Sequence, residues 1–481
     1  MAAHALPFSD DLAALTNKRA LPGELRMPAE SLECQSFIAH QAATESNART
    51  YPRKLPFALA QGKGVYLKDV DGNVYYDCLA GAGAIALGHN HAAVQNAIRE
   101  QLDADLPMLT LDITTPVKQT YVDEILSLFP EEFARHARIQ FCGPSGADAV
   151  EAAIKLVKHA TGRRGIMSFQ GGYHGMTHGA LSLMGKLSAK NIPGLMSDVQ
   201  FLPYPYRYRP PFGNADSVDT DCSAYIENLL TDDESGIVKP AGIILEAIQG
   251  EGGKIPASAR FLRELRRITT EQDIPLILDE VQTGLGRTGR MFAFEHAGIV
   301  PDVVVLSKAI GGALPMAVVV YHEKLDKWGP GAHAGTFRGN QLGMAAGIAT
   351  IRYIRRHDLA GNATRMGNVF LEQLRQLQRE TRCIGDVRGL GLMLGMEIVN
   401  AWSGRMQQGQ PERFGEMASR IQYESFCRGL IVETGGRQGS VIRLMPPLII
   451  TGEQVLHICS ILRDAVRAAE HALAPAEPCT A

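Results

Sequence analysis

Short runs of consecutive apolar residues recur between residues 138 and 321 and alternate with longer stretches of helical periodicity. A run that is apolar at every position is typical of a strand buried on both faces of a sheet. Alternation of such strands with helices predicts βα units and a mostly parallel sheet with helices on both faces. We expect strands at residues 138–142, 165–169, 199–202, 242–248, 275–278, 303–306 and 317–321.

The hydrophobic pattern differs on either side of this central part. From residue 58, turn signals such as Asp71-Gly72-Asn73 separate short β-rich runs, which predicts a small antiparallel meander. Beyond about residue 345 the pattern predicts a separate α+β domain, because long amphipathic helices surround short strand-like pieces. These helices are expected at residues 341–356, 367–379, 411–428 and 452–473.

Composition narrows the class of protein. The chain has 481 residues, 21% of them charged, and a net charge of −3, so nothing indicates disorder, nucleic-acid binding or a membrane-surface protein. The eight cysteines are scattered and form no C-x-x-C pair, which argues against a disulfide framework or a zinc module. No export signal or membrane-spanning apolar segment is recognisable. We therefore expect a soluble cytoplasmic protein.

A metal site is not predicted. His89 and His91 lie two residues apart, but no cysteine or carboxylate at ligand spacing accompanies them. A loop that runs into a helix at residues 92–102 explains both histidines.

Polar residues that could carry chemistry follow two neighbouring apolar runs. Lys308 comes directly after the run at residues 303–306 and shortly before a Gly-Gly turn, and Asp279-Glu280 ends the preceding run. Ligands of open α/β sheets bind at the carboxyl ends of the strands. A carboxylate buried there requires a cationic partner, which suits Asp279, whereas helix capping or solvation explains Glu280 better.

Two glycine-containing loops follow other strands of the set. Residues 141–151 (FCGPSGADAVE) join a strand to a helix, and the small residues there leave backbone N–H groups accessible to a phosphate. The spacing matches neither a Walker A loop nor G-x-G-x-x-G, so ATP and a dinucleotide are not indicated. Ser145 could equally be a helix N-cap. Tyr173, within residues 171–175, could stack on a planar ligand or simply pack in a turn.

These four features together fit one cofactor. Pyridoxal 5'-phosphate needs an anchor for its phosphate, an aromatic side chain against its ring, a carboxylate at its ring nitrogen and a lysine for its aldehyde. The combination is far more specific than any one of its members.

Over residues 55–448 the chain resembles the class III (omega) aminotransferases of the fold-type I pyridoxal-phosphate enzymes. Within that class it is most similar to the L-2,4-diaminobutyrate:2-oxoglutarate 4-aminotransferases. This narrower resemblance rests on ESNARTYPRKLPFAL at residues 45–59, YHGMTHGALS at 173–182 and GTFRGN at 335–340.

The resemblance implies an α/β fold with a large and a small domain. The large domain has the mostly parallel sheet flanked by helices, and the smaller α+β domain combines the N- and C-terminal parts. We accordingly divide the chain into an N-terminal extension (1–50), the N-terminal part of the small domain (51–100), the large cofactor-binding domain (101–345) and the C-terminal small domain (346–481).

The resemblance also implies the roles of the cofactor-site residues. Lys308 is similar to the Schiff-base lysine, and Asp279 to the partner of the pyridinium nitrogen. Gln282 is similar to the residue beside the 3-oxygen of the cofactor, and Tyr173 to the aromatic that stacks on the ring. The phosphate cradle is matched by Ser145, Gly146 and Ala147.

Two further matches concern the neighbouring subunit and the substrate. Thr336 is similar to a phosphate ligand that the neighbouring subunit contributes, which implies a homodimer with shared active sites, or a higher assembly of such dimers. Arg443 is similar to the arginine that binds the α-carboxylate of glutamate or 2-oxoglutarate. Glu251 is similar to the gate that neutralises this arginine when the other substrate presents its distal amine.

The implied reaction is amino transfer between glutamate/2-oxoglutarate and L-aspartate 4-semialdehyde/L-2,4-diaminobutyrate. The alternatives are another omega-aminotransferase, of the ornithine, 4-aminobutyrate or acetylornithine type, and a non-catalytic binding protein on the same fold. Two positions depart from the pattern: Ala247 stands where the class usually has proline, and Met176 stands where the ornithine and 4-aminobutyrate enzymes have an arginine for the far carboxylate. Arg53 or Arg338 could replace that arginine.

Overall fold

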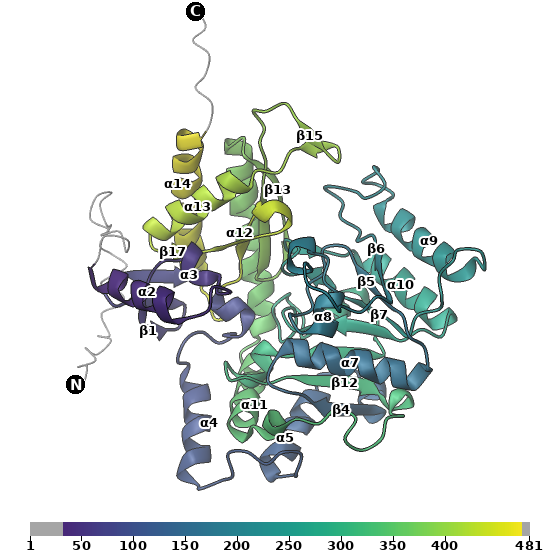
Figure 1. Cartoon of the computed structure of the whole chain (residues 1–481). Coiled ribbons are helices and arrows are strands. Elements are labelled where there is room, and N and C mark those ends of the chain that lie inside the picture. Colours follow the sequence, from purple (N-terminus) through teal and green to yellow (C-terminus); the bar gives the residue numbers. More distant parts are fainter. Residues whose placement is uncertain (1–31, 474–481) are drawn as a thin grey trace, which may run out of the picture.

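The computed structural model describes residues 32–473 (Figure 1). Residues 1–31 of the predicted extension and the last residues of the predicted C-terminal domain, 474–481, lie outside the described part. The described part of the extension contains helix α2 (Leu32–Thr44), which is followed by α3 (Tyr51–Lys54). The backbone N–H of Ala58 lies 3.0 Å from Sγ of Cys34, so α2 packs beside the first strand of the meander.

A seven-stranded sheet forms the centre of the fold, in the order β4-β12-β11-β10-β7-β5-β6. Only β12 runs against the other strands, so the prediction of a mostly parallel sheet is confirmed. The strands are β4 (Ala137–Phe141), β5 (Ile166–Phe169), β6 (Val199–Leu202), β7 (Gly242–Leu245), β10 (Leu276–Asp279), β11 (Val303–Leu306) and β12 (Val318–His322).

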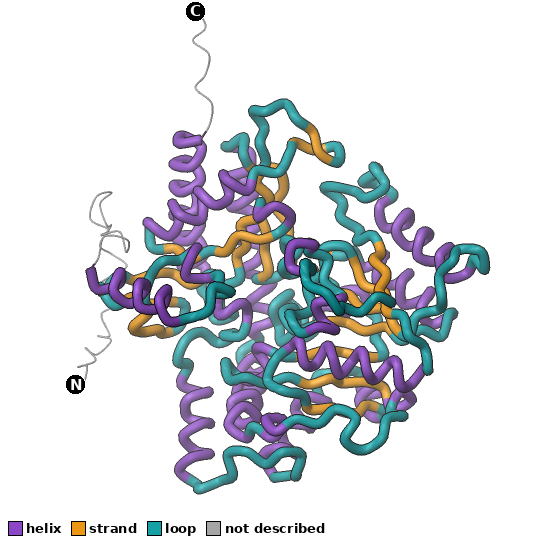
Figure 2. The backbone as a smooth tube through the Cα atoms, viewed as in Figure 1, coloured by secondary structure: helices purple, strands orange, loops and turns teal. Residues whose placement is uncertain are grey.

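Both faces of this sheet are buried, which explains why its strands are apolar at every position. On β11, Val303 and Val305 pack with the apolar side chains of α7 (Gly146–Thr161) on one face. Val304 and Leu306 belong to the cluster on the other face, which includes α10 (Ala259–Glu271). Successive residues of a strand point to opposite faces, so a strand between two helical layers needs apolar residues throughout. Figure 2 shows these strands among the helices.

Two smaller sheets lie toward the upper left of Figure 1. The predicted antiparallel meander is confirmed, and it is extended by β17 from the C-terminal part of the chain, parallel to β3. This sheet contains β1 (Leu59–Lys63), β2 (Tyr66–Asp69), β3 (Val74–Asp77) and β17 (Leu430–Ile431). The other has the order β13-β14-β19-β18, with β13 (Ile384–Leu390), β14 (Met393–Ile398), β18 (Glu433–Gly435) and β19 (Val441–Leu444).

Long helices pack around the central and the small sheets. They are α4 (Ala92–Asp103), α5 (Pro116–Leu126), α9 (Val218–Thr231), α11 (Gln341–Arg356), α12 (Leu359–Glu380), α13 (Gly415–Cys427) and α14 (Gly452–Leu473). No helix within residues 32–473 is long and apolar enough to span a bilayer. The division into four parts remains a prediction.

The structure corrects several predicted boundaries. The strand expected at residues 242–248 ends at Leu245, because the next residue, Glu246, turns to accept backbone hydrogen bonds from Tyr173 and Gly250. The helix expected from residue 367 already begins at Leu359, where the side chain of Asp358 caps it by accepting from the N–H of Gly361. The helix expected from residue 411 begins only at Gly415.

Candidate active site

Asp279 and Lys308 lie at the carboxyl ends of adjacent parallel strands. Asp279 is the last residue of β10 and is in register with Val305 of β11, and Lys308 begins the short helix that follows β11. Lys308 has a φ of +51°, an unusual conformation for a residue with a side chain. Backbone strain of this kind clusters at functional sites, so the geometry agrees with a special role for this lysine.

The Asp279 carboxylate is almost fully buried but well partnered. Its Oδ2 lies 2.8 Å from Nδ1 of His174, and its Oδ1 accepts from the N–H of Val281 at 3.1 Å. Burial alone would lower the pKa of His174, but the hydrogen bond and charge of Asp279 raise it above its ordinary value. The contact with Asp279 thus shifts the imidazole toward its protonated form, in which it would place a positive charge beside the buried carboxylate.

The amine of Lys308 lies in an environment that shifts it toward its neutral form. Burial lowers the pKa of this amine, against the opposing charges of nearby carboxylates, of which Glu251 contributes most. A neutral amine is the form that attacks an aldehyde or accepts a proton from carbon.

The N-terminus of α7 packs directly against both strand ends. Ser145 is the N-cap, and its side chain accepts from the N–H of Asp148. The N–H groups of Gly146 and Ala147 precede the first intrahelical hydrogen bonds, so they stay free for an anion at the positive end of the helix. A Cβ on Gly146 would lie 3.0 Å from Val281 and 3.6 Å from Ser307, so only glycine lets the cradle approach this closely.

Tyr173 borders the site after β5. Its backbone N–H donates to Oε1 of Glu246 at 2.9 Å, while its ring is 38% exposed. Burial raises the pKa of Glu246 to about 7. The exposed ring can stack on a planar ligand, because the backbone of this loop is anchored from behind.

The Gln282 amide is held from two sides. Its Oε1 accepts from the Nζ of Lys254 at 2.7 Å, and its Nε2 donates to the carbonyl of Ala82 at 3.2 Å. Gly250 lies so close that a Cβ there would be 2.2 Å from the Gln282 oxygen. The side chain is therefore fixed between the meander and the loop that carries Glu251.

Arg443 lies between two carboxylates. Its guanidinium forms a very short contact with Glu251 and a second ion pair with Glu433 at 2.7 Å. Burial alone would lower the pKa of Arg443, but the two carboxylates outweigh it and raise that pKa. The side chain of Glu251 is 36% exposed and that of Glu433 only 10%, so Glu251 is the partner with room to move.

The remaining predicted residues lie farther from these contacts. Thr336 is exposed and starts a short helix, η7 (Thr336–Gly339), which also contains the half-buried Arg338. Arg53 donates to the carbonyl of Asn47 at 2.9 Å, and Met176 is 59% exposed. Within residues 32–473, neither arginine forms an ion pair with the Glu251 side chain, and a carboxylate-binding role for them remains a prediction.

A cluster of potential metal ligands lies behind the phosphate cradle. Ligand atoms of Cys142, Asp148 and His333 lie within 4.8 Å of one another. Hydrogen bonds already use the Asp148 carboxylate, which accepts from the N–H of Gly143 and pairs with Nε2 of His333 at 3.0 Å. The hydrogen bond from His333 lowers the pKa of Asp148, and burial raises that of the Cys142 thiol. Internal contacts thus account for the Asp148 carboxylate and for Nε2 of His333, whereas the buried Nδ1 of His333 has no hydrogen-bond partner within residues 32–473.

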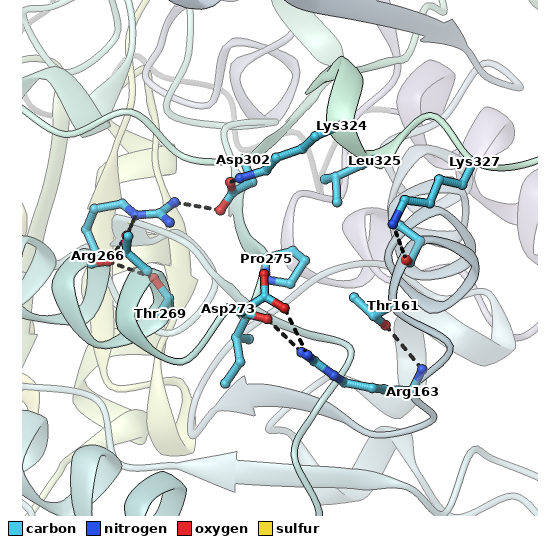
Figure 3. A pocket seen from close by; sticks show the side chains of 13 residues that line it. Thr161, Arg163, Arg266, Thr269, Asp273, Pro275, Asp302, Lys324, Leu325 and Lys327 are labelled. Atoms are coloured by element: carbon cyan, nitrogen blue, oxygen red, sulfur yellow. Dashed lines mark hydrogen bonds and ion pairs between the residues drawn. The ribbon is translucent and has the colours of Figure 1, made fainter.

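A cavity of about 460 Å³ lies at the opposite edge of the central sheet (Figure 3). Its lining includes Pro275 and Asp302, which precede β10 and β11, whereas Asp279 and Lys308 follow those strands. Its cations already have partners: Arg163 pairs with Asp273, both Arg266 and Lys324 pair with Asp302, and Lys327 donates to the carbonyl of Ala160. This cavity is thus separate from the predicted chemistry.

Three residues near the site were missed by the sequence reasoning. His174 was noted only as part of a glycine loop, although a histidine after a strand end signals a possible partner for an acid. Glu433 and Lys254 gave no local signal. Both lie in short segments whose partners are distant in the sequence, on β19 and after β10.

The residues present fit pyridoxal 5'-phosphate. Free N–H groups lie at the start of α7, and an exposed ring is available at Tyr173. The Asp279 carboxylate is anchored by His174, and the Lys308 amine has a lowered pKa. Each group of the cofactor has a complementary partner in this set.

Comparison with known proteins supports this interpretation. Residues 48–466 match the family Aminotransferase class-III. The chain is 51% identical to the diaminobutyrate–2-oxoglutarate aminotransferase of Rhizobium meliloti (strain 1021), over 95% of this chain and 97% of that protein. It is also 51% identical to the diaminobutyrate–2-oxoglutarate aminotransferase of Haemophilus influenzae, over 85% and 90% of the two chains.

A solved structure shows the same fold. The PLP-bound amine transaminase from an uncultivated Pseudomonas species superimposes with a TM-score of 0.78, at 29% identity, over 89% of this chain and 98% of that one. The family match and the two relatives each span most of the chain, so the resemblance found in the sequence is confirmed. The chain belongs to the class-III aminotransferases.

Proposed function

We propose that the chain transfers an amino group between glutamate/2-oxoglutarate and L-aspartate 4-semialdehyde/L-2,4-diaminobutyrate, with pyridoxal 5'-phosphate as cofactor. The observation that carries this proposal is the pairing of Arg443 with two carboxylates, one of which, Glu251, is partly exposed and also acts on the charge of the Lys308 amine. The 51% identity to two diaminobutyrate–2-oxoglutarate aminotransferases supports the choice of substrate.

In this proposal the cofactor is held by the predicted residues. The N–H groups of Gly146 and Ala147, with Ser145, bind its phosphate, Tyr173 covers the ring, and Asp279 keeps the ring nitrogen protonated. When bound, pyridoxal 5'-phosphate supplies an aldehyde that takes the amino group and a ring that accepts electrons from the reacting carbon.

The Lys308 amine moves the proton in the reaction. As a neutral base it would remove the proton from the amine-bearing carbon of the substrate, and as the resulting acid it would give a proton back to complete the transfer. The lowered pKa of Lys308 supports this role, because a fully charged ammonium cannot accept a proton.

Glu251 and Arg443 adapt one pocket to two substrates. With glutamate, Glu251 leaves Arg443, whose planar guanidinium then binds the α-carboxylate with two hydrogen bonds. With L-2,4-diaminobutyrate, whose distal amine reacts, Glu251 returns and neutralises Arg443. Glu433 stays with Arg443 in both cases, because it is buried on the neighbouring strand.

A homodimer fits the exposed surface next to Thr336. Backbone hydrogen bonds join residues 108–110 to 339–341, with Gln341 donating to Met108 at 3.0 Å. Exposed apolar side chains gather on these segments, namely Leu106, Met108, Leu109, Leu111, Ile113 and Phe337. An apolar surface of this kind fits a second copy of the chain, which would bring its Thr336 to the phosphate site.

We also propose the four-part division given above and a cytoplasmic location. The pairing of β17 with β3 supports a small domain built from both ends of the chain. All seven cysteines in the described part are free thiols, which suits a reducing compartment.

The amino-donor profile of the purified holoenzyme with 2-oxoglutarate tests the function. We expect L-2,4-diaminobutyrate to give the highest kcat/KM, and 4-aminobutyrate and ornithine to be at least about tenfold poorer, a difference of about 1.4 kcal/mol. A preference for 4-aminobutyrate or ornithine would overturn the substrate assignment. Absence of transfer from every donor would overturn the function.

A further inference from the structure

Lys254 is a buried lysine that has no part in the proposed mechanism. It follows the Glu251 loop, is fully buried and has a φ of +54°. Space for it is made by Gly395 of β14, where a Cβ would lie 3.0 Å from the Cβ of Lys254. Burying a lysine in a strained backbone conformation is costly, so a specific contact has to explain it.

The main polar contact of the Lys254 side chain is with Gln282. Its Nζ donates to Oε1 of Gln282 at 2.7 Å and lies 3.7 Å from the sulfur of Met445. No carboxylate pairs with Lys254 within residues 32–473, unlike the nearby Arg443, which has two. The hydrogen bond to the glutamine is therefore its strongest contact.

This arrangement fixes which way the Gln282 amide faces. The carbonyl of Ala82 can only accept, so the amide nitrogen has to face it, and the amide oxygen then faces Lys254. A lysine donates to that oxygen in either protonation state. The amide nitrogen has two hydrogens and gives one to Ala82, which leaves the second available to a ligand.

We propose that Lys254 is a positioning residue that holds the Gln282 amide in the orientation that donates a hydrogen bond to the 3-oxygen of the cofactor. The inference rests on the proposed function, because Gln282 is the residue expected beside that oxygen. Without Lys254, the amide oxygen of Gln282 loses its donor, and the amide can rotate. The amide oxygen would then face the 3-oxygen of the cofactor, and two acceptors cannot form a hydrogen bond.

Charges around Lys254 are consistent with this role. Burial, reinforced by the charge of Arg443, lowers the pKa of Lys254 well below its ordinary value, and Lys308 acts in the same direction. The carboxylates of Glu251 and Glu433 oppose this shift. The position thus shifts Lys254 toward its neutral form, which still has hydrogens to donate to Gln282.

A double-mutant cycle on the holoenzyme tests whether Lys254 acts through Gln282. We expect Lys254→Met to lower the single-turnover rate with glutamate about tenfold or more in the wild-type background. In the Gln282→Leu background the same change should cost less than about twofold, because the group that Lys254 positions is already gone. Lys158→Met is the matched control, since its Nζ also lies near a methionine sulfur, 3.8 Å from Met196, but outside the site.

Absorbance titration gives a readout that does not depend on turnover. A donor to the 3-oxygen stabilises its anionic form, so Lys254→Met should raise the pH midpoint of the visible cofactor band by about one unit, and Lys158→Met should leave it unchanged. If Lys254→Met does not fold, Lys254→Gln keeps a donor and should give a smaller shift in the same direction.

The outcomes separate this inference from the proposed function. An active wild-type enzyme with the same loss from Lys254→Met in both backgrounds would refute the positioning role, and so would an unshifted midpoint. A wild-type holoenzyme without amino transfer from any donor would instead refute the function itself.

Discussion

The cofactor side and the substrate side of the site are built differently. On the cofactor side, Asp279 and Lys308 end adjacent strands of one sheet, and the start of α7 packs against both. On the substrate side, Arg443 lies on β19 of another sheet and meets Glu251, whose side chain is 36% exposed. One side is a fixed frame, while the other contains a contact that can open.

This difference corresponds to what each side has to do. The cofactor stays in place through both halves of the proposed reaction, so its partners benefit from rigid strand ends. The substrate changes from the dicarboxylate glutamate to the diamino acid L-2,4-diaminobutyrate, so the substrate pocket needs a charged side chain that can move. We therefore expect changes on the cofactor side to lower the rates of both half-reactions alike. Changes on the substrate side should lower the rate of one half-reaction more than that of the other.

Replacement of Lys308 should have the largest effect. Lys308→Ala removes the amine that moves the proton, so we expect both half-reactions to slow by at least about 10⁴-fold. Single-turnover kinetics with each substrate measures this. Full steady-state turnover in the variant, with the cofactor band retained, would contradict the role of Lys308.

The substitution Asp279→Asn should have the second-largest effect. Asparagine keeps the size of the side chain and can still accept from His174, but it removes the charge that protonates the ring nitrogen. We expect a folded protein, as judged by circular dichroism, and a loss of about 10²- to 10⁴-fold in both half-reactions. Wild-type single-turnover rates would count against the assignment.

Arg443→Lys probes the substrate side. Lysine keeps the positive charge but lacks the planar fork that binds a carboxylate with two hydrogen bonds. We expect kcat/KM for 2-oxoglutarate to fall about 10- to 100-fold, or ~1.4–3 kcal/mol, mainly through KM. An equal loss for L-2,4-diaminobutyrate would show that Arg443 serves both substrates in the same way.

Glu280 is only 2% exposed, so the solvation expected for it from the sequence is wrong, and its buried carboxyl offers a smaller effect, on stability. Burial raises its pKa to about 7 in the folded protein, so its contribution to stability is complete below the unfolded pKa and is lost as pH rises through about 7. Glu280→Gln keeps an acceptor for the N–H of Phe294, and the hydroxyl of Thr283 can turn to accept. Urea unfolding of the cofactor-saturated protein should therefore show a weaker loss of stability between pH 5 and 8 in the variant than in wild type.

Much of the cofactor side could be predicted from the sequence, because its signals are local. Apolar runs identified the strands, and the polar residue after each run marked the edge where ligands bind. The resemblance to a family then implied a role for each of these residues. The placement of Asp279, Lys308 and the start of α7 agrees with that expectation, while their roles remain to be tested.

The substrate side was harder to predict, because its contacts join distant segments. Glu433 meets Arg443 through the register of β18 with β19, and β18 is too short to be recognised from its pattern. Lys254 reaches Gln282 only because Gly395 leaves space on a third segment. Such contacts depend on tertiary packing rather than on local periodicity.

The most direct test of this account is the ratio of the two half-reaction rates in Glu251→Gln, measured by stopped-flow absorbance. We expect the diaminobutyrate half-reaction to slow at least about tenfold, because Arg443 is no longer neutralised, while the glutamate half-reaction stays within about threefold of wild type. Glu433→Gln is the control, and should shift both half-reactions in the same direction. Equal slowing of both half-reactions in Glu251→Gln would contradict a movable gate and the division of the site into a fixed and a switching side.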